Sequence, residues 1–421
     1  MARKMKDSGI EWIGEIPEGW ETCLYKYCCS VQPGYPFDSA KFSNSNTDGF
    51  PLIRIRDITS GEIQTYYTDS YDSSYIITAG DLLVGMDGDF NVRWWNNFDA
   101  LLNQRCCRII EKGRVSRRFI YYVLPFTLQY INTLTYATTV KHLANGDILN
   151  SFIAFPSLSI QKNITCYLDK NCSNIDSILS KTRASIEEYK KLKQAVITQA
   201  VTKGVRGERE MKDSGVEWIG EIPVEWEISR IKYVSIFEPS CDFRKLTPET
   251  IITYSPMECI KNGTFERRTS LYGNLAHTLT PFQDGDIVMA KVTPCFENGN
   301  IAIMNELQSG YGLGSSELFV FRPQNINTKY LFYWLQNKLF VHQACATMTG
   351  TGGLKRISPS FVKNCNIHYP AAAEQAEIAD YLDAKCAEID GLIAKKEQLV
   401  KELESYKKSL IYEVVTGKRE V

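Results

Sequence analysis

The chain has 421 residues, 44% of them hydrophobic and 23% charged, with a formal net charge of −1. This composition excludes a largely disordered chain, and the length is sufficient for two or three domains. The near-neutral charge excludes nucleic-acid binding through overall charge alone, so any DNA contact must come from local basic patches.

No apolar run approaches 18 residues, and the polar N-terminus MARKMKDSG lacks the apolar core of a signal peptide. We therefore expect a cytoplasmic protein without a membrane span. The thirteen cysteines are scattered and have no zinc-site spacing, which indicates reduced thiols that are at least partly buried.

The N-terminal segment occurs twice in the chain. MKDSGIEWIGEIPEGWE at residues 5–21 returns as MKDSGVEWIGEIPVEWE at 211–227, with 14 of 17 positions identical. A period above two hundred residues is too long for a solenoid repeat, so each copy should lead into a domain-sized unit. We interpret Trp12 and Trp218, which are equivalent in the two copies, as residues of a strap. The strap docks on a shared scaffold or on a partner protein, an interpretation we prefer to direct DNA contact.

The two segments that follow the strap resemble each other only faintly. Residues 80–84, GDLLV, correspond to residues 285–289, GDIVM, and each predicts a turn that leads into a short strand. Residues 117–124 correspond to 328–335, and each predicts a short apolar helix. Residues 51–56, PLIRIR, alternate apolar and charged side chains, which predicts a half-exposed strand. Each segment is therefore expected to be a mixed α/β domain.

Residues 161–202 predict one long helix, because apolar residues recur at heptad spacing and neither proline nor glycine interrupts them. The block 138–202 aligns with 352–416 without a gap, with 18 of 65 positions identical, so a second such helix should end the chain. Two helices with apolar seams would bury those seams most simply against each other, as an antiparallel coiled coil. The alternative is that each helix packs separately on its own domain.

The repeated string DSGIEWIGEIPEGW, together with Q-x-x-I-x-x-Y-L-D at the start of each long helix, resembles the specificity subunit of type I restriction-modification enzymes. The helix motif carries Tyr167 and Leu168 in the first copy and Tyr381 and Leu382 in the second. The resemblance covers the whole chain and implies an α/β (α+β) fold with an internal pseudo-twofold repeat. By this resemblance, two target-recognition domains would be separated by a pair of long antiparallel coiled-coil helices. The expected order is a strap (1–21), recognition domain 1 (22–158), a spacer helix (159–206), a second strap (207–227), recognition domain 2 (228–372) and a second spacer helix (373–421).

The function that the resemblance implies is DNA recognition without catalysis. Each recognition domain would read one half of a bipartite, asymmetric site in double-stranded DNA, and the helices would set the spacing between the halves. Two methylation subunits, and optionally two restriction subunits, would be the partners. S-adenosylmethionine would bind the methylation subunit, so no cofactor is expected in this chain.

Candidate DNA-binding residues are basic side chains beside strand-like or small-residue stretches. Because arginine and lysine are the usual contacts to phosphates and guanine, we select ten such residues, although a solvated surface residue is the alternative for each. Two of the pairs, Lys141-His142 and Lys355-Arg356, follow the small residues Thr138-Thr139 and Gly352-Gly353 at equivalent places in the two copies. The complete set is Arg54, Arg56, Arg93, Lys141, His142, Arg267, Arg268, Lys291, Lys355 and Arg356. The adjacent Trp94 and Trp95 are expected to pack in a core rather than to stack on a base.

Several enzymatic motifs are missing from the sequence. There is no Pro-Pro dipeptide of the kind that an adenine methyltransferase pocket needs, and no GxxxxGK[ST] phosphate-binding loop. The four histidines, His142, His277, His342 and His368, are far apart and have no metal-site spacing. Two other hypotheses remain: a structural adaptor whose recognition domains no longer read DNA, and a single-chain modification enzyme, which the missing motifs disfavour.

Overall fold

The computed structural model describes residues 3–134, 141–261, 263–276, 278–351 and 353–421. The chain forms two compact units: unit 1 comprises Met1–Lys181 with Leu399–Val421, and unit 2 comprises Thr182–Gln398. Each unit therefore contains one strap, one set of sheets and a part of both long helices. No helix in the described part of the chain is long and apolar enough to cross a membrane.

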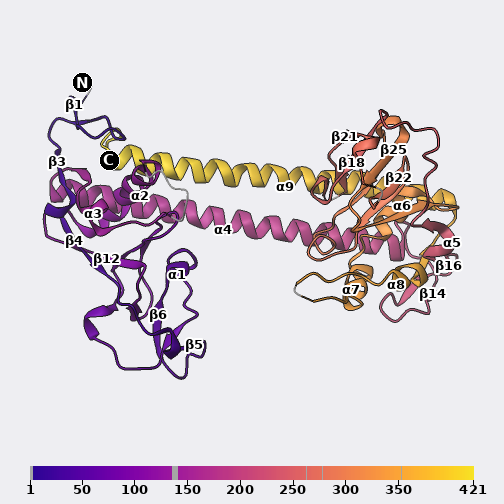
Figure 1. Ribbon diagram of the computed structural model, residues 1–421, viewed down its shortest axis with the longest axis horizontal. Helices are drawn as coiled ribbons and strands as arrows, with labels where there is room; N and C mark the ends of the chain where they lie inside the picture. Colours follow the sequence, from indigo (N-terminus) through magenta and orange to yellow (C-terminus); the bar gives the residue numbers. More distant parts are fainter. Residues whose placement is uncertain (1–2, 135–140, 262, 277, 352) are drawn as a thin grey trace. The chain divides into compact units, whose positions relative to one another are not determined.

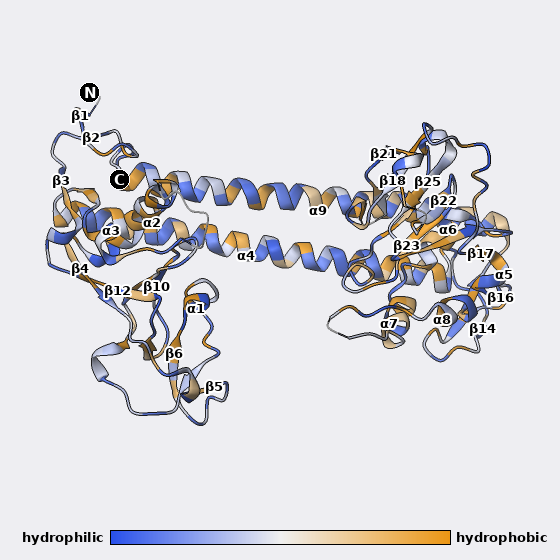
Figure 2. Ribbon diagram, in the orientation of Figure 1, coloured by the Kyte–Doolittle hydropathy of each residue, from blue (hydrophilic) through white to orange (hydrophobic). Residues whose placement is uncertain are grey.

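The two long helices are α4, Leu158–Lys203, and α9, Ala372–Val415. They confirm the predicted helix over 161–202 and its twin. At 1.5 Å per residue, the 46 residues of α4 span about 69 Å. Gly204 and Gly417 follow the two helices with φ of +78° and +71°, the left-handed conformation in which glycine commonly ends a helix. In Figure 2, apolar and polar bands alternate along both helices, as expected for helices with one buried seam.

The two helices pack against each other within each unit. In unit 2, Lys193 of α4 binds Asp390 of α9 with an Nζ–Oδ2 distance of 2.6 Å. In unit 1, Lys407 of α9 binds Asp176 of α4, with an Nζ–Oδ1 distance of 2.6 Å. Asp176 and Asp390 are equivalent in the two copies, and so are Lys193 and Lys407, because 214 residues separate each pair. The same ion pair is thus made twice with the roles of the two helices exchanged, which is the contact pattern of an isologous dimer.

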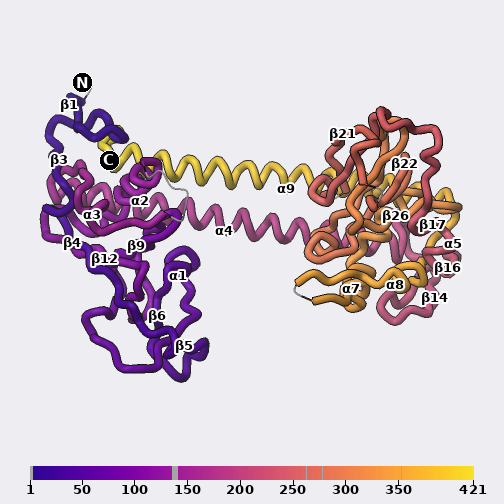
Figure 3. The backbone as a smooth tube through the Cα atoms, viewed as in Figure 1, coloured from indigo at the N-terminus to yellow at the C-terminus, as the bar shows by residue number. Residues whose placement is uncertain are grey.

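Unit 1 contains two main sheets, with strand orders β10-β9-β12-β4 and β5-β7-β6-β11-β8. A two-stranded sheet of β13 and β3 also belongs to this unit. Its strands are β1 Met5–Asp7, β2 Glu15–Pro17, β3 Glu21–Leu24, β4 Cys29–Pro33, β5 Phe42–Ser43, β6 Phe50–Ile53, β7 Tyr66–Tyr67, β8 Ile76–Ile77, β9 Leu82–Gly85, β10 Val92–Trp94, β11 Ala100–Leu102, β12 Cys106–Glu111 and β13 Phe152–Phe155. Its shorter helices are η1 Tyr25–Tyr27, η2 Ser39–Lys41, α1 Ile55–Ser60, η3 Ser73–Tyr75, α2 Arg117–Leu134 and α3 Asn145–Leu149. Within this unit, α2 and α3 lie beside α4, whereas β5 and β6 lie at the far end from it (Figures 1 and 3).

Unit 2 repeats this architecture with the strand orders β17-β26-β23-β24 and β21-β18-β25-β22. Its strands are β14 Met211–Asp213, β15 Glu221–Pro223, β16 Glu227–Arg230, β17 Ser235–Phe237, β18 Ile251–Ser255, β19 Ile260–Lys261, β20 Thr264–Phe265, β21 Arg268–Leu271, β22 Thr280–Gln283, β23 Ile287–Ala290, β24 Ile301–Ile303, β25 Tyr311–Gly314, β26 Leu318–Pro323 and β27 Asn366–Tyr369. Its shorter helices are α5 Ile231–Val234, η4 Met257–Cys259, η5 Tyr272–Asn274, η6 Gln308–Gly310, α6 Thr328–Trp334, α7 Lys338–Ala346 and α8 Pro359–Asn364.

The two units share the order of four strands in each of their two main sheets, although their sequences between the straps and the helices barely match. The edge strand β5 of unit 1 has no counterpart in the corresponding sheet of unit 2. In both units the second sheet contains a parallel pair, β6 with β11 and β18 with β25. In both, the first sheet places β9 or β23 between two antiparallel neighbours. The fold is therefore the predicted mixed α/β repeat with long helices, and the repeat extends through the recognition segments.

One predicted strand is partly wrong. Residues 51–53 belong to β6, but the strand ends there, and Arg54 is the N-cap residue of the helix α1, which begins at Ile55. The reason is the buried Asp57, whose carboxylate accepts a hydrogen bond from the backbone N–H of Arg54 at 2.8 Å. An acidic side chain three residues into a segment stabilises a helix start in this way. The predicted turn-strand units are confirmed by β9 and β23, and the helix predicted over 117–124 extends to Leu134 as α2.

The cores are made by the strap, the sheets and the apolar seams of the helices. Ile16 and Trp20 of the first strap are buried with α2 residues and with Leu410 and Val414 of α9. The equivalent Ile222 and Trp226 are buried with α6 residues and with Ile197 and Val201 of α4. All thirteen cysteines are free thiols, and Cys166 alone among them is exposed. The strap therefore packs on the chain's own scaffold in both units.

Candidate nucleic-acid interface

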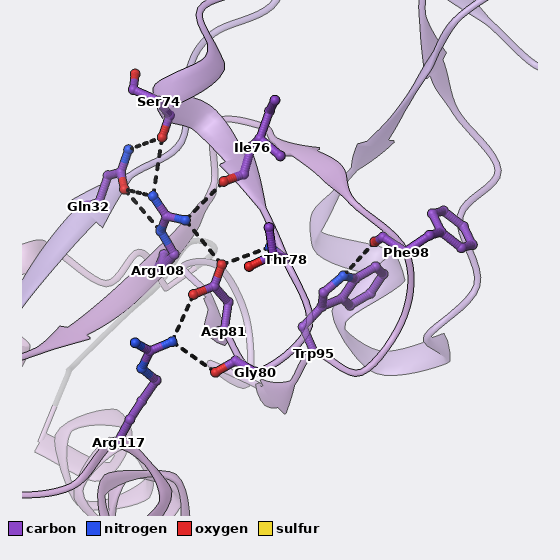
Figure 4. A network of polar contacts seen from close by, with 10 residues as sticks. All are labelled: Gln32, Ser74, Ile76, Thr78, Gly80, Asp81, Trp95, Phe98, Arg108 and Arg117. Atoms are coloured by element: carbon purple, nitrogen blue, oxygen red, sulfur yellow. Dashed lines mark hydrogen bonds and ion pairs between the residues drawn. The ribbon is translucent and has the colours of Figure 1, made fainter.

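The recognition segments are held to their scaffold by a buried aspartate that occurs in both units. In unit 1, Asp81 precedes β9 and accepts from the backbone N–H of Thr78, from Arg108 at 3.1 Å and from Arg117 at 2.9 Å (Figure 4). Arg108 also donates to the carbonyl of Ile76 at 2.9 Å. Because Arg108 lies on β12 and Ile76 on β8, this arginine joins the two sheets of the unit.

Unit 2 contains the same arrangement around Asp286, which is fully buried. Arg322 of β26 binds both carboxylate oxygens of Asp286 at 2.8 Å, and the backbone N–H of Gln283 donates to it at 2.9 Å. Asp81 and Asp286 are the aspartates of the two predicted Gly-Asp turns. Their repetition therefore has a structural reason, which is to anchor an arginine from the neighbouring strand.

A second repeated network joins the recognition segments to the long helices. Asp169 of α4 accepts from Arg118 and from the hydroxyl of Tyr122, both on α2. Asp383 of α9 accepts from Lys329 at 2.6 Å and from the hydroxyl of Tyr333 at 2.7 Å, both on α6. Burial, and then the hydrogen bond to the aspartate, raises the pKa of each tyrosine. These contacts explain why the repeated helix motif ends on an aspartate, Asp169 in the first copy and Asp383 in the second.

The other motif residues also have local roles. The buried side chains of Gln161 and Gln375 accept from the backbone N–H of Ser116 and Asn327, each at 2.8 Å, and so tie α2 and α6 to the helix starts. Of the motif residues that we predicted to bind scaffold or partner, Leu168 and Leu382 are fully buried in the two cores. Tyr167 is partly buried, and Tyr381 remains 40% exposed.

Trp12 and Trp218, the equivalent tryptophans selected from the sequence, are placed against the scaffold of their own unit. Trp12 stacks on Phe126 with ring centroids 6.2 Å apart, and its carbonyl accepts from the hydroxyl of Tyr412 at 3.0 Å. Trp218 packs against the core of unit 2 and is partly buried. Trp95 is fully buried, and its indole N–H donates to the carbonyl of Phe98 at 2.9 Å (Figure 4). Core packing was the expectation for Trp95, and the structure confirms it.

The basic pairs predicted to be equivalent are indeed equivalent in the fold. The backbone of His142 forms an isolated antiparallel β-bridge with Asp87, just past β9. The backbone of Arg356 forms the same kind of β-bridge with Val292, just past β23. We call these two positions the strand-end sites. In unit 1 the His142 Nδ1 lies 2.7 Å from an Asp87 carboxylate oxygen and 3.3 Å from the Arg105 guanidinium. Thr138, Thr139 and Gly352, the small residues predicted beside these pairs, lie outside the described residues, as does His277.

In unit 2 the strand-end site carries a different charge pattern. Arg356 donates to the Glu317 carboxylate through Nε at 2.9 Å and through Nη2 at 2.7 Å, and this hydrogen bonding lowers the pKa of Glu317. Lys291 lies with its Nζ 5.6 Å from the ring centroid of Phe319. The backbone of Lys355 pairs with Thr293 at 2.9 Å, while Lys141 of unit 1 donates to the carbonyl of Asn132 at 2.6 Å. The two sites therefore share a backbone frame but present different side chains.

The remaining candidates lie around α1 in unit 1 and around the β19-β20 hairpin in unit 2. Arg54 caps α1 and lies 5.9 Å from the ring of Phe42, and Arg93 donates to the carbonyls of Ile58 and Thr59 at the end of α1. Arg56 donates to the buried hydroxyl of Thr65 at 3.0 Å, and its side chain is 51% exposed. Arg93 therefore uses its guanidinium for the fold, whereas Arg56 presents its guanidinium at the surface.

In unit 2 the predicted arginines are paired with carboxylates. Arg268 binds Glu266 at 3.0 Å and Glu258 at 3.2 Å, and the hydrogen bonds from Arg268 lower the pKa of Glu266. Arg267 binds Glu306 at 2.6 Å. Glu258 is in η4, which follows β18 just as α1 follows β6. The predicted arginines near α1 in unit 1 and those near η4 in unit 2 thus lie in equivalent regions of the two units.

The structure also shows residues that the sequence did not single out. A polar cavity of about 660 Å³ lies beside Arg56 in unit 1, lined by Asn44, Asn46, Ile63, Gln64 and Tyr66, among others. The available signal was the run SNSNTDG at residues 43–49, which is typical of a surface loop, the usual location of binding residues. We call this space the amide cavity.

Potential metal-binding side chains are dispersed through the described part of the chain. No group of three or more His, Cys, Asp or Glu side chains in that part of the chain could hold a metal ion. His368 is buried, and burial lowers the pKa of its imidazole. His342 is exposed at the surface of α7.

The comparison with known proteins agrees with this architecture. The family model of the type I restriction modification DNA specificity domain matches residues 17–188 and again 223–402. The type I restriction enzyme EcoBI specificity subunit of Escherichia coli is 35% identical over 202 residues, which span 48% of this chain and 42% of that protein. The type I restriction enzyme MjaVIII specificity subunit of Methanocaldococcus jannaschii is 24% identical, with 96% of this chain and 93% of that protein aligned.

A solved structure shows the same fold. A chain from work on complex assembly and conformational transition of the type I R-M system superposes with a TM-score of 0.69 at 14% identity, covering 96% of this chain and 99% of that one. The chain aligns over less than half of the length of two of the E. coli relatives, 42% for the EcoBI and 27% for the EcoEI specificity subunit.

Proposed function

Because the chain belongs to the type I restriction modification DNA specificity family, we propose that each unit reads one half of a bipartite, asymmetric site in double-stranded DNA. The observation that carries this proposal is that both units repeat the same strand order and the same two anchoring networks, around Asp81 or Asp286 and around Asp169 or Asp383. The side chains at the surfaces of the two units nevertheless differ. Two equal frames with unequal surfaces would bind two different sequences. An asymmetric site is therefore the expected target.

The long helices are proposed to set the distance between the two half-sites. The length of α4, about 69 Å, is much more than a domain core of this size needs. The exchanged ion pairs Lys193–Asp390 and Lys407–Asp176 hold the two helices in one register within their units. A helix pair in a single register is suited to act as a spacer.

The chain is proposed to contribute recognition and assembly, and no catalysis. Two methylation subunits would dock on the two equivalent scaffolds, and restriction subunits would join them to complete the complex. S-adenosylmethionine would bind the methylation subunits. Tyr167 and Tyr381, which are equivalent and only partly covered, are the residues we propose for contact with these partners.

The proposed DNA contacts come from the surface candidates of the two units. Arg56, Arg267 and Arg268 present exposed guanidinium groups around α1 and the β19-β20 hairpin. Lys141, His142, Lys355 and Arg356 lie at or beside the strand-end sites. Their carboxylate partners hold several of these cations in fixed orientations, which favours selective contact over general attraction to phosphates.

The proposal is tested by measuring whether the chain, purified with the methylation subunit of its host, methylates adenine in a sequence-selective way. Single-molecule sequencing of methylated host DNA should show one two-part motif with a constant gap, and a strain without this chain should lack it. If the methylation pattern is the same in both strains, the proposed function is wrong. A structural adaptor would instead bind its protein partners but show no salt-dependent binding to the methylated duplex.

A further inference from the structure

The amide cavity has a chemistry that distinguishes it from a general phosphate-binding surface. The side-chain amides of Asn44, Asn46 and Gln64 make no hydrogen bond within the described part of the chain. All three side chains are on exposed residues, so their donors and acceptors face solvent. Arg56 is the single cation of the lining, and Ile63 adds an apolar surface. Phosphate contacts rely mainly on several cations, whereas this lining has more amides than charges.

Arg56 is held ready for a directed contact. Its guanidinium donates to Thr65, whose side chain is buried, and its Nε lies 3.5 Å from the carboxylate of the buried Asp57. About half of the side chain still faces solvent. A guanidinium that is fixed from behind by buried groups loses less conformational entropy on binding than a free one, and it favours one geometry of contact.

From these observations, and resting on the proposed function, we infer that the amide cavity reads base edges in the half-site bound by unit 1. Asparagine and glutamine amides match the N6 donor and N7 acceptor of adenine, and an arginine fork matches O6 and N7 of guanine. Ile63 offers apolar contact to a thymine methyl group. The half-site of unit 1 therefore contains at least one adenine read by Asn44, Asn46 or Gln64, and one guanine read by Arg56.

The equivalent region of unit 2 has a different donor and acceptor pattern. Arg268 lies between Glu258 and Glu266, so carboxylate acceptors replace the amides of unit 1. Carboxylates accept hydrogen bonds from the cytosine amino group and repel phosphates. The two units thus differ at the place where we locate base reading in unit 1, which agrees with an asymmetric target.

The inference is tested by selection from a randomised DNA duplex library. The full-length chain is purified from its host with the subunits that accompany it, and the bound duplexes are sequenced. The triple variant N44A/N46A/Q64A should lose preference at an adenine position of one half-site by roughly 5- to 150-fold, as expected for one bidentate contact. R56A should lose preference at a guanine position of the same half-site. The other half-site should be unchanged in both variants.

The matched control is Asn174→Ala, an exposed asparagine of α4 in the same unit, which should select the wild-type motif. If the wild-type complex selects a two-part motif and both cavity variants select it unchanged, the inference is wrong and the proposed function stands. An equal loss of affinity for every sequence would also overturn it, because that result indicates phosphate binding. If the wild-type complex selects no motif, the proposed function fails and this inference fails with it.

Discussion

The anchoring role of Asp286 can be tested by removing its carboxylate. Asp286 is fully buried and accepts from Nε and Nη2 of Arg322, each at 2.8 Å, and from the backbone N–H of Gln283. The variant Asp286→Ala leaves the Arg322 guanidinium without its ionic partner. Unit 2 also provides a matched control, since Asp242 binds Arg244 with the same two-pronged geometry, at 2.8 and 2.7 Å, on the surface.

The magnitude follows from the burial of the pair. Removing one partner of a buried ion pair costs about 3–5 kcal/mol. Arg322 retains 21% of its side-chain exposure and a hydrogen bond to the carbonyl of Ser240, so we expect the lower end, about 3 kcal/mol. The side chains of Arg244 and Asp242 are 88% and 50% exposed, and water replaces their pair at little cost.

Hydrogen exchange followed by mass spectrometry measures the effect locally, which avoids treating two units as one cooperative transition. In Asp286→Ala, peptides from residues 280–323 should exchange more than 100-fold faster, because each 1.4 kcal/mol is a factor of ten. Peptides of unit 1 should be unchanged, and Asp242→Ala should match the wild type throughout. An equal effect of the two substitutions, or less than a tenfold change in Asp286→Ala, would refute the anchoring argument.

Three further predictions concern the spacer, the strap and pH. Deleting residues 182–188 and 396–402 together should shorten the gap in the methylated motif by about 3 bp, because one heptad is about 10 Å of helix, and a changed half-site sequence at an unchanged gap would contradict the spacer role. Trp12→Ala should free the strap from Phe126 and Tyr412 at a cost of about 2 kcal/mol, seen as faster exchange in residues 5–17 and at the end of α9, and normal protection there would contradict docking. Since burial lowers the pKa of His368 below that of the unfolded chain, the unfolded state takes up the proton first, and the stability of unit 2 should fall as the pH drops below about 6.5. The urea midpoint followed by circular dichroism should fall less between pH 7.5 and 5.5 in His368→Gln, and an identical shift in both proteins would exclude this histidine as the cause.

The repeat could be recognised in the sequence only where its residues face the scaffold. Several positions of the strap and of the helix motif match because they have a defined partner, such as the α2 tyrosine for Asp169 and the α6 tyrosine for Asp383. The recognition segments share their strand order but hardly any residues, since a sheet tolerates many side chains once its buried positions are apolar. Their common topology therefore became visible only in three dimensions.

The sequence by itself determined the long helices, the straps and the Gly-Asp turns, because periodic seams and turn residues are local signals. Only the structure showed that a helix begins directly after Arg54, where the carboxylate of the buried Asp57 accepts a hydrogen bond from the Arg54 backbone N–H. It also separated the predicted arginines into those that serve the fold, such as Arg93, and those that face solvent, such as Arg56. The amide cavity could not be predicted, because Asn44 and Gln64 lie far apart in the chain and are brought together only when β5, β6 and β7 form their sheet.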